Sequence, residues 1–148
     1  MDYASLMNSA GNFVEPTLAS TQAAVQNAII MNGTITSNNN GTSATSGSAI
    51  SLPGGDQSWT HVSLLDAPGV DSYPITSFSY LLLYKELSTN IDSMEKAQAL
   101  AQFVNWAITD GQQQQFATPL HYVPLPDSVV QHNQETLRSL TFNGQPVI

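Results

Sequence analysis

The most hydrophobic stretch of this chain is short, and a proline precedes it. Residues 73–86 read YPITSFSYLLLYKE, with an apolar run from Tyr80 to Tyr84. A membrane-spanning helix needs roughly 20 apolar residues, and this run lacks the period of an amphipathic helix. We therefore predict a buried strand here. Pro74 predicts an extended lead-in, because proline fixes its own φ and cannot donate a backbone hydrogen bond.

Charged side chains are scarce, and acids outnumber bases. The formal net charge is -8, from 11 acidic and 3 basic side chains in 148 residues, and charged residues make up 9% of the chain, against about 25% in average soluble domains. So few bases exclude counterion-driven binding to DNA or RNA. Two explanations of this low charge stay open: an acidic environment, in which carboxylates are protonated and hydrate poorly, and a compositional bias of the lineage.

Three segments carry the periodicity of amphipathic helices. They are residues 17–31, 93–110 and 128–140. Asp92 and Asp127 precede the second and third segments and are predicted as their N-caps. The apolar faces are expected at Leu18, Val25, Ala28 and Ile29, at Ala97, Leu100, Ala101, Val104, Ala107 and Ile108, and at Val130, Leu137 and Leu140.

The segments between these helices are predicted as loops, short helical pieces and turns. Residues 32–58 are rich in Gly, Ser and Asn, which predicts a long exposed loop, and this loop holds two N-glycosylation triplets, at Asn32 and Asn40. Residues 59–65 predict a short strand or turn, residues 112–118 a short helix, and residues 142–144 a turn. Strands and helices mixed in this way predict an α/β architecture.

No catalytic, metal or cofactor constellation is visible in the sequence. The three histidines show no ligand spacing that would bring them together; they are His61, His121 and His132. Asp66 and Asp71 flank a Pro-Gly turn and are interpreted as solvated turn residues. The segment 41–48 lacks the strand, lysine and helix of a phosphate-binding loop, and the absence of cysteine excludes thiolate chemistry. We expect a protein that is not an enzyme and carries no metal or cofactor.

Four segments, in order, resemble one family: the phosphate-binding proteins that serve ABC transporters. They are 2-DYASLMNSAGNFVEPTLASTQAA-24, 73-YPITSFSYLLLYKE-86, 103-FVNWAITDGQQQQ-115 and 122-YVPLPDSVV-130. Each segment alone is a weak signal, but all four occur at compatible spacing. Together they cover most of the chain outside the 32–58 loop.

The resemblance implies a periplasmic-binding-protein-like (type II) fold with two lobes, of which this chain supplies the C-terminal part. Residues 1–72 would belong to the second lobe and residues 76–148 to the first, with the hinge crossover at 73–75. The residues expected at the hinge, which we call the crossover residues, are Tyr73, Pro74, Ile75 and Thr76.

The family's phosphate ligands lie upstream of everything matched here, so no phosphate-binding residue carries over to this chain. Arg138, in the last predicted helix, corresponds to none of them. The resemblance therefore implies a fragment that supplies scaffold and hinge for capture of inorganic phosphate. Its expected partners are an ABC-transporter permease and the missing N-terminal half or another chain. Its expected location is extracellular, at the cell surface, with membrane anchoring through the missing part.

Two other functions stay open. The chain would be a surface or structural protein that reuses this half-fold for assembly, or part of a binding protein for another oxyanion. If the chain is part of a binding protein, for phosphate or for another oxyanion, we expect it to expose apolar surface when it is alone. Each lobe would need both halves of the longer chain.

Overall fold

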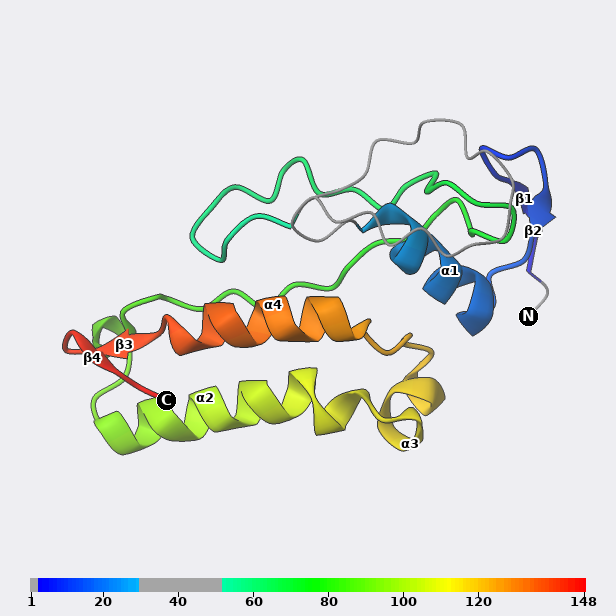
Figure 1. The fold of residues 1–148 in the computed structure, drawn as a ribbon. Helices are drawn as coiled ribbons and strands as arrows, with labels where there is room; N and C mark the ends of the chain where they lie inside the picture. The colour runs from blue at the N-terminus through cyan, green and yellow to red at the C-terminus, as the bar shows by residue number, and fades with distance from the viewer. Residues whose placement is uncertain (1–2, 30–51) are drawn as a thin grey trace. The chain divides into compact units, whose positions relative to one another are not determined.

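The computed structural model describes residues 3–29 and 52–148 (Figure 1). The chain divides into two compact units, Met1–Pro53 with Ser58–Ser79, and Gly54–Gln57 with Tyr80–Ile148. We call these unit 1 and unit 2. Most of the predicted 32–58 loop, including Asn32 and Asn40, lies outside the described residues.

Unit 1 contains a short hairpin and one helix. Strands β1 (Leu6–Met7) and β2 (Phe13–Val14) pair antiparallel, with Leu6 opposite Val14. Helix α1 (Leu18–Ala28) follows and begins with a reciprocal capping box, in which Thr17 Oγ1 accepts from the backbone N–H of Ser20 and the Thr17 N–H donates to Ser20 Oγ. This box satisfies backbone donors that the first helical turn leaves unpaired.

The core of unit 1 is small and built mainly from alanines. One face of α1 packs against residues of the 58–79 segment, which lacks regular secondary structure. The buried members are Ala24, Val25, Ala28, Leu64 and Ala67, with Ile29 and Phe78 partly buried against them. Few large apolar side chains are buried here, so apolar burial stabilises this unit only modestly. Polar contacts therefore contribute much to the positioning of residues 58–79.

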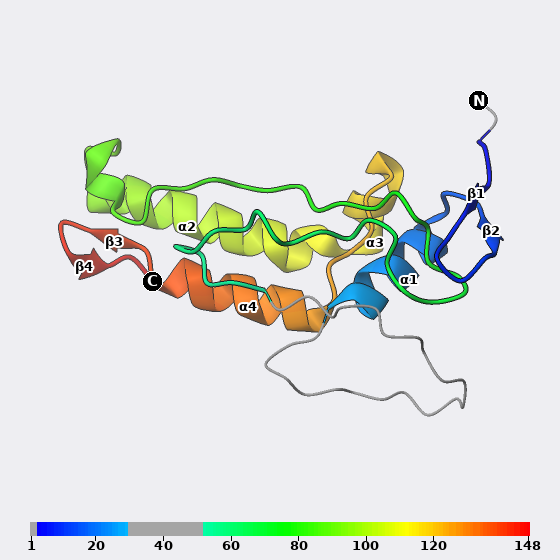
Figure 2. The same ribbon diagram turned by 90° about the horizontal axis from the view of Figure 1, so that it is seen from above.

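Unit 2 is organised around two helices that run side by side in opposite directions. Helix α2 (Met94–Ile108) and helix α4 (Asp127–Arg138) lie next to each other in both views (Figures 1 and 2). The core between them and the C-terminal hairpin consists of Leu87, Ala97, Ala101, Val104, Leu137, Leu140, Phe142 and Val147. The alanines on α2 allow close approach of its neighbours.

Shorter elements complete unit 2. The 3-10 turn η1 (Leu87–Thr89) precedes α2, while η2 (Asp110–Gln112), α3 (Gln114–Ala117) and η3 (Thr118–Leu120) connect α2 to the passage before α4. Strands β3 (Thr141–Phe142) and β4 (Gln145–Pro146) form an antiparallel hairpin after α4. The turn predicted at 142–144 is therefore confirmed, with Asn143 and Gly144 both at positive φ.

The predicted helices are confirmed where the structure describes them, and two predicted caps are wrong. Ser93, and not Asp92, caps α2, with Ser93 Oγ accepting from the Lys96 N–H at 3.4 Å. Asp92 instead forms an exposed ion pair with Lys96 one turn on. Asp127 is the first residue of α4, and Pro126 occupies the cap position without a side-chain bond. Proline before a helix already supplies the extended backbone that a cap position requires.

The prediction of a buried strand at residues 80–84 is wrong for the described chain. The segment is extended but belongs to no sheet, and its exposed fractions run from 38% at Leu83 to 94% at Leu82. Residues 59–65 likewise form turns and no strand. The described residues thus combine helices with two short hairpins, consistent with part of an α/β fold. Within this described part, no helix has the length and apolar character needed to span a membrane.

Candidate functional site

The crossover residues lie in unit 1, where hydrogen bonds hold three of the four in place. The Tyr73 N–H donates to the Ser20 carbonyl in α1 at 3.1 Å, and the Pro74 carbonyl accepts from the Asp66 N–H at 2.8 Å. Thr76 is buried, and its hydroxyl donates to the Tyr73 carbonyl at 3.1 Å. Ile75 is 63% exposed. The backbone bends at Pro74 and Ile75, so the extended lead-in predicted from Pro74 is wrong at these two residues, although hydrogen bonds anchor the passage.

A buried asparagine fixes the loop that leads to the crossover residues. Asn8 Nδ2 lies within 3.0–3.1 Å of the carbonyl oxygens of Gly69, Val70 and Ser72. Asn8 Oδ1 accepts from the N–H groups of Ala10 and Asn12 at 3.1 and 3.0 Å. One side chain thereby satisfies backbone groups from two segments about sixty positions apart, which is how a buried polar group avoids its desolvation cost.

Ser72 and Gly69 complete this network. Ser72 is fully buried; its Oγ donates to the Pro68 carbonyl at 2.6 Å and accepts from Asn27 Nδ2 at 3.0 Å. Gly69 has a φ of +111°, and a Cβ built there would lie 2.3 Å from Asn27 Nδ2. Glycine is therefore required by the backbone conformation, and a Cβ there would also displace the Asn27 amide group.

The apolar run, Tyr80–Tyr84, begins unit 2 and leaves its side chains exposed. Tyr80 is 51% exposed, and its partial burial raises the pKa of its hydroxyl. From Leu81 to Tyr84, no hydrogen bond joins the backbone to another described residue. The expectation that this chain exposes apolar surface is confirmed here. Unpaired extended backbone with apolar side chains is the kind of surface that pairs with another strand.

Glu86 ends this extended segment and is the most heavily hydrogen-bonded carboxylate among the described residues. Its Oε1 accepts from the N–H and hydroxyl of Ser88 at 3.1 and 2.7 Å and from the Asn143 N–H at 2.8 Å. Its Oε2 accepts from the Thr141 hydroxyl at 2.9 Å and the Gly144 N–H at 3.0 Å. The hydrogen bond from the Ser88 side chain, followed by that from the Gly144 backbone, lowers the pKa of Glu86 to about 2.

The donors around Glu86 converge on its carboxylate. Asn143 and Gly144, with φ of +49° and +74°, turn successive backbone N–H groups toward the same point, as in backbone nests that bind anions. In this chain, the anion that these N–H groups bind is the carboxylate of Glu86. The sequence did not predict this contact, because Glu86 and the C-terminal hairpin are more than fifty positions apart. It predicted only the Asn-Gly turn that supplies two of the donors.

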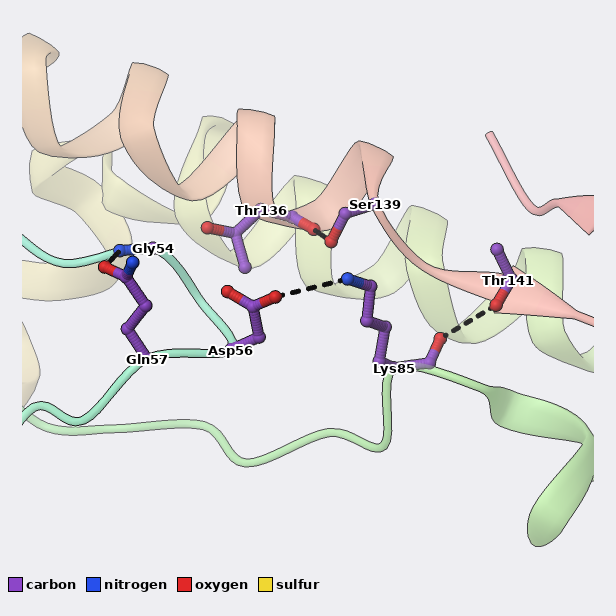
Figure 3. A network of polar contacts seen from close by, with 7 residues as sticks. All are labelled: Gly54, Asp56, Gln57, Lys85, Thr136, Ser139 and Thr141. Carbon is purple, nitrogen blue, oxygen red and sulfur yellow. Dashed lines mark hydrogen bonds and ion pairs between the residues drawn. The ribbon is translucent and has the colours of Figure 1, made fainter. Parts of the chain in front are cut away.

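A short segment from earlier in the chain also joins unit 2 near this point (Figure 3). Asp56 forms an exposed ion pair with Lys85 at 3.3 Å, and the Lys85 carbonyl accepts from the Thr141 N–H at 2.8 Å. Such an exposed pair contributes little to stability. Gly55 approaches α4 so closely that a Cβ there would lie 2.1 Å from the Thr136 methyl.

Metal-ligating side chains do not cluster within residues 3–29 and 52–148. No group of three His, Asp or Glu side chains in these ranges could hold a metal ion. His61 lies in unit 1, whereas His121 and His132 lie in unit 2. The segment 41–48 lies outside the described residues.

Comparison with known proteins supports the resemblance drawn from the four motifs. The chain is 32% identical over 128 residues to the phosphate-binding protein PstS of Methanocaldococcus jannaschii, covering 85% of this chain and 28% of the relative. It is 33% identical over 132 residues to PstS of Pasteurella multocida, covering 89% of this chain and 30% of the relative. PstS of Xylella fastidiosa strain 9a5c is 31% identical over 135 residues. No family model matches the chain.

These matches cover most of this chain but a small part of each relative. The chain spans 28–30% of the length of the relatives that it matches. The predicted similarity to part of a phosphate-binding protein is therefore confirmed. The division into lobes at residues 73–75 stays a prediction; the boundary between the two compact units falls a few residues later, between Ser79 and Tyr80.

Proposed function

Because this chain is similar over most of its length to part of the phosphate-binding proteins, we propose that it supplies scaffold and crossover to a protein that captures inorganic phosphate. The observation that carries the proposal is identity of 31–33% over 85–89% of this chain to several proteins of that name. The role is one of binding and not of catalysis. The phosphate ligands would belong to the remaining part of the protein.

The anchored start of the 73–86 segment supports a scaffold role. Bonds from α1 and from residue 66 hold the crossover residues, and the loop before them is held by the buried Asn8 side chain. A segment that passes between lobes must leave each lobe from a fixed point, because a loose exit would not transmit closure around a ligand. We place the crossover at Tyr73 to Thr76.

The proposal extends to location and partners. A phosphate-capturing protein of this kind would act outside the cytoplasmic membrane and deliver its ligand to an ABC-transporter permease. The low charge of the chain, 9% of residues, is compatible with an acidic exterior. Asn32 and Asn40 would be glycosylation sites in a host that modifies such triplets.

Calorimetric titration of inorganic phosphate into the 148-residue chain tests where the ligands lie. We expect no saturable heat, and the same for sulfate and molybdate, because the resemblance carries no phosphate-ligand residue over to this chain. The chain has only three basic side chains, and Lys85 and Lys96 are paired with aspartates. Saturable binding of phosphate would refute the assignment of the ligands to the remaining part.

A second candidate function is assembly, and the exposed apolar run favours it. Leu81, Leu82 and Tyr84 are each more than 60% exposed, so a surface or structural protein built on this half-fold would bury them against another chain. Binding of a hydrophobic dye to the chain alone, lost on addition of a partner polypeptide, would support this second function. Retention of phosphate binding by a complex that includes the chain would support the first.

A further inference from the structure

The turn of the C-terminal hairpin contains a dipeptide that is prone to a covalent change. An asparagine loses its side-chain amide most readily when glycine follows it, because glycine has no side chain to hinder attack by its nitrogen. Within residues 3–29 and 52–148 this dipeptide occurs once, as Asn143-Gly144 between β3 and β4. Both residues are exposed in this chain, so burial does not protect the pair.

Deamidation of this pair consumes water and releases ammonia. A bond forms between the Gly144 nitrogen and Asn143 Cγ, the proton of that N–H is lost, and the bond from Cγ to Nδ2 breaks as ammonia leaves. Water then opens the resulting cyclic imide at either of its two carbonyl groups. The product at position 143 is aspartate or isoaspartate, and isoaspartate carries an additional carbon in the main chain.

The Glu86 carboxylate binds the nitrogen that would attack. The Gly144 N–H donates to Glu86 Oε2 at 3.0 Å, and the Asn143 N–H donates to Glu86 Oε1 at 2.8 Å. Two successive N–H groups converge in this way while Asn143 keeps its left-handed backbone, with a φ of +49°. In that conformation the next nitrogen is turned away from the Cβ of the same residue. Attack on Cγ therefore requires the peptide to rotate, which breaks the bond from Gly144 to Glu86.

Glu86 is itself held in place by residues outside the turn dipeptide. Its Oε1 accepts from the N–H and the hydroxyl of Ser88 at 3.1 and 2.7 Å, and its Oε2 accepts from the Thr141 hydroxyl at 2.9 Å. The carboxylate therefore cannot follow the peptide as it rotates without losing bonds of its own. The rotated turn is a locally opened state, and its population sets how often the nitrogen can react.

We propose that Asn143 is a deamidation site, and that the Glu86 carboxylate keeps the rate of its deamidation low by binding the Gly144 N–H. The proposal goes beyond phosphate capture and does not depend on it. Isoaspartate at position 143 would separate the two N–H groups that share the carboxylate, because the main chain between them would be longer. The modification would therefore release the C-terminal hairpin from η1 irreversibly.

Incubation of the 148-residue chain at mildly alkaline pH, followed by peptide mass spectrometry, tests this role of Glu86. Glu86→Ala removes the acceptor of both N–H groups. Val104→Ala is the matched control for lost stability, because Val104 is buried in α2 of the same unit and forms none of the Glu86 hydrogen bonds. The same chain in concentrated urea gives the rate of the pair without the contact.

We expect native wild type to deamidate at position 143 at least about tenfold more slowly than the chain in urea, and Glu86→Ala to recover most of that difference, because reaction requires local opening. Val104→Ala should stay close to wild type. Equal acceleration by Glu86→Ala and Val104→Ala would overturn the proposal, since general unfolding would then set the rate. Slower deamidation in Glu86→Ala would also overturn it, because the carboxylate would then act as a base that promotes attack.

Ser88→Ala keeps the test decisive if Glu86→Ala does not fold. It removes one hydrogen bond to the Glu86 carboxylate and leaves the turn dipeptide and the apolar core unchanged. We expect it to raise the rate of deamidation at position 143 at least about threefold, since a hydrogen bond to a charged group is among the stronger ones. A rate for Ser88→Ala no higher than that of Val104→Ala would overturn the proposal.

Discussion

At the scale of single residues, two polar side chains each satisfy several backbone groups at once. Asn8 ties two distant segments of unit 1 together, and Glu86 ties the C-terminal hairpin of unit 2 to the start of η1. Both side chains form hydrogen bonds with backbone groups of distant residues, and sequence patterns do not predict such bonds. Each can be tested by substituting that one side chain.

The Glu86 contact predicts a specific dependence of stability on pH. The pKa of Glu86 is lowered from 4.5 to about 2 in the folded state. Its stabilising effect is therefore complete above pH 4.5 and is lost as the pH falls toward 2. Thermal unfolding should show E86Q less stable than wild type at pH 7, with the difference shrinking as the pH falls from 4.5 through 2.

Glu135→Gln is the matched control for the loss of one negative charge, because Glu135 is an exposed residue of the same unit. It should melt close to wild type throughout the pH range. A difference between wild type and E86Q that is as large at pH 2 as at pH 7 would contradict the assigned role of the carboxylate.

The Asn8 contact predicts a loss of stability in unit 1. Asn8→Ala leaves three carbonyl groups and two N–H groups without their partner, and we expect a loss of about 2–3 kcal/mol in the free energy of unfolding. Chemical denaturation measures it. Asn12→Ala removes an exposed side chain from the same hairpin and should change stability by less than about 0.5 kcal/mol. Equal effects of the two substitutions would refute the role of Asn8.

At the scale of elements, helices were predicted well and the strand was not. The apolar faces of α2 and α4 repeat at three and four residues, and Ala97, Ala101 and Leu137 are buried as predicted. Their caps were misplaced by one residue, since Ser93 and Asp92 are both acceptable caps by type. The run at 80–84 was predicted to be buried from its composition alone, but burial needs a partner surface, and the described chain supplies none.

The contact of the 54–57 segment with α4 gives a prediction at this scale. Gly55→Ala places a methyl group against the Thr136 side chain, and overpacking of this kind costs about 1–3 kcal/mol. Thr136→Ala removes the obstructing methyl. In a double-mutant cycle followed by thermal unfolding, the combined variant should recover at least about 1 kcal/mol relative to additivity. Additive effects would show that the two residues do not touch.

At the scale of the whole molecule, the sequence pointed to a part of a larger protein. Four short motifs predicted the similarity that comparison confirmed over 85–89% of this chain. They could not predict which apolar side chains are exposed, because exposure depends on packing contacts that the motifs do not report.

The central claim is that this chain is scaffold for a phosphate site whose ligands lie elsewhere. The most direct test replaces the matching part of the Methanocaldococcus jannaschii PstS with this chain and titrates the chimera with inorganic phosphate by calorimetry. We predict saturable binding within about tenfold of the unmodified relative, a difference of about 1.4 kcal/mol. A chimera that folds cooperatively but does not bind phosphate would contradict the claim.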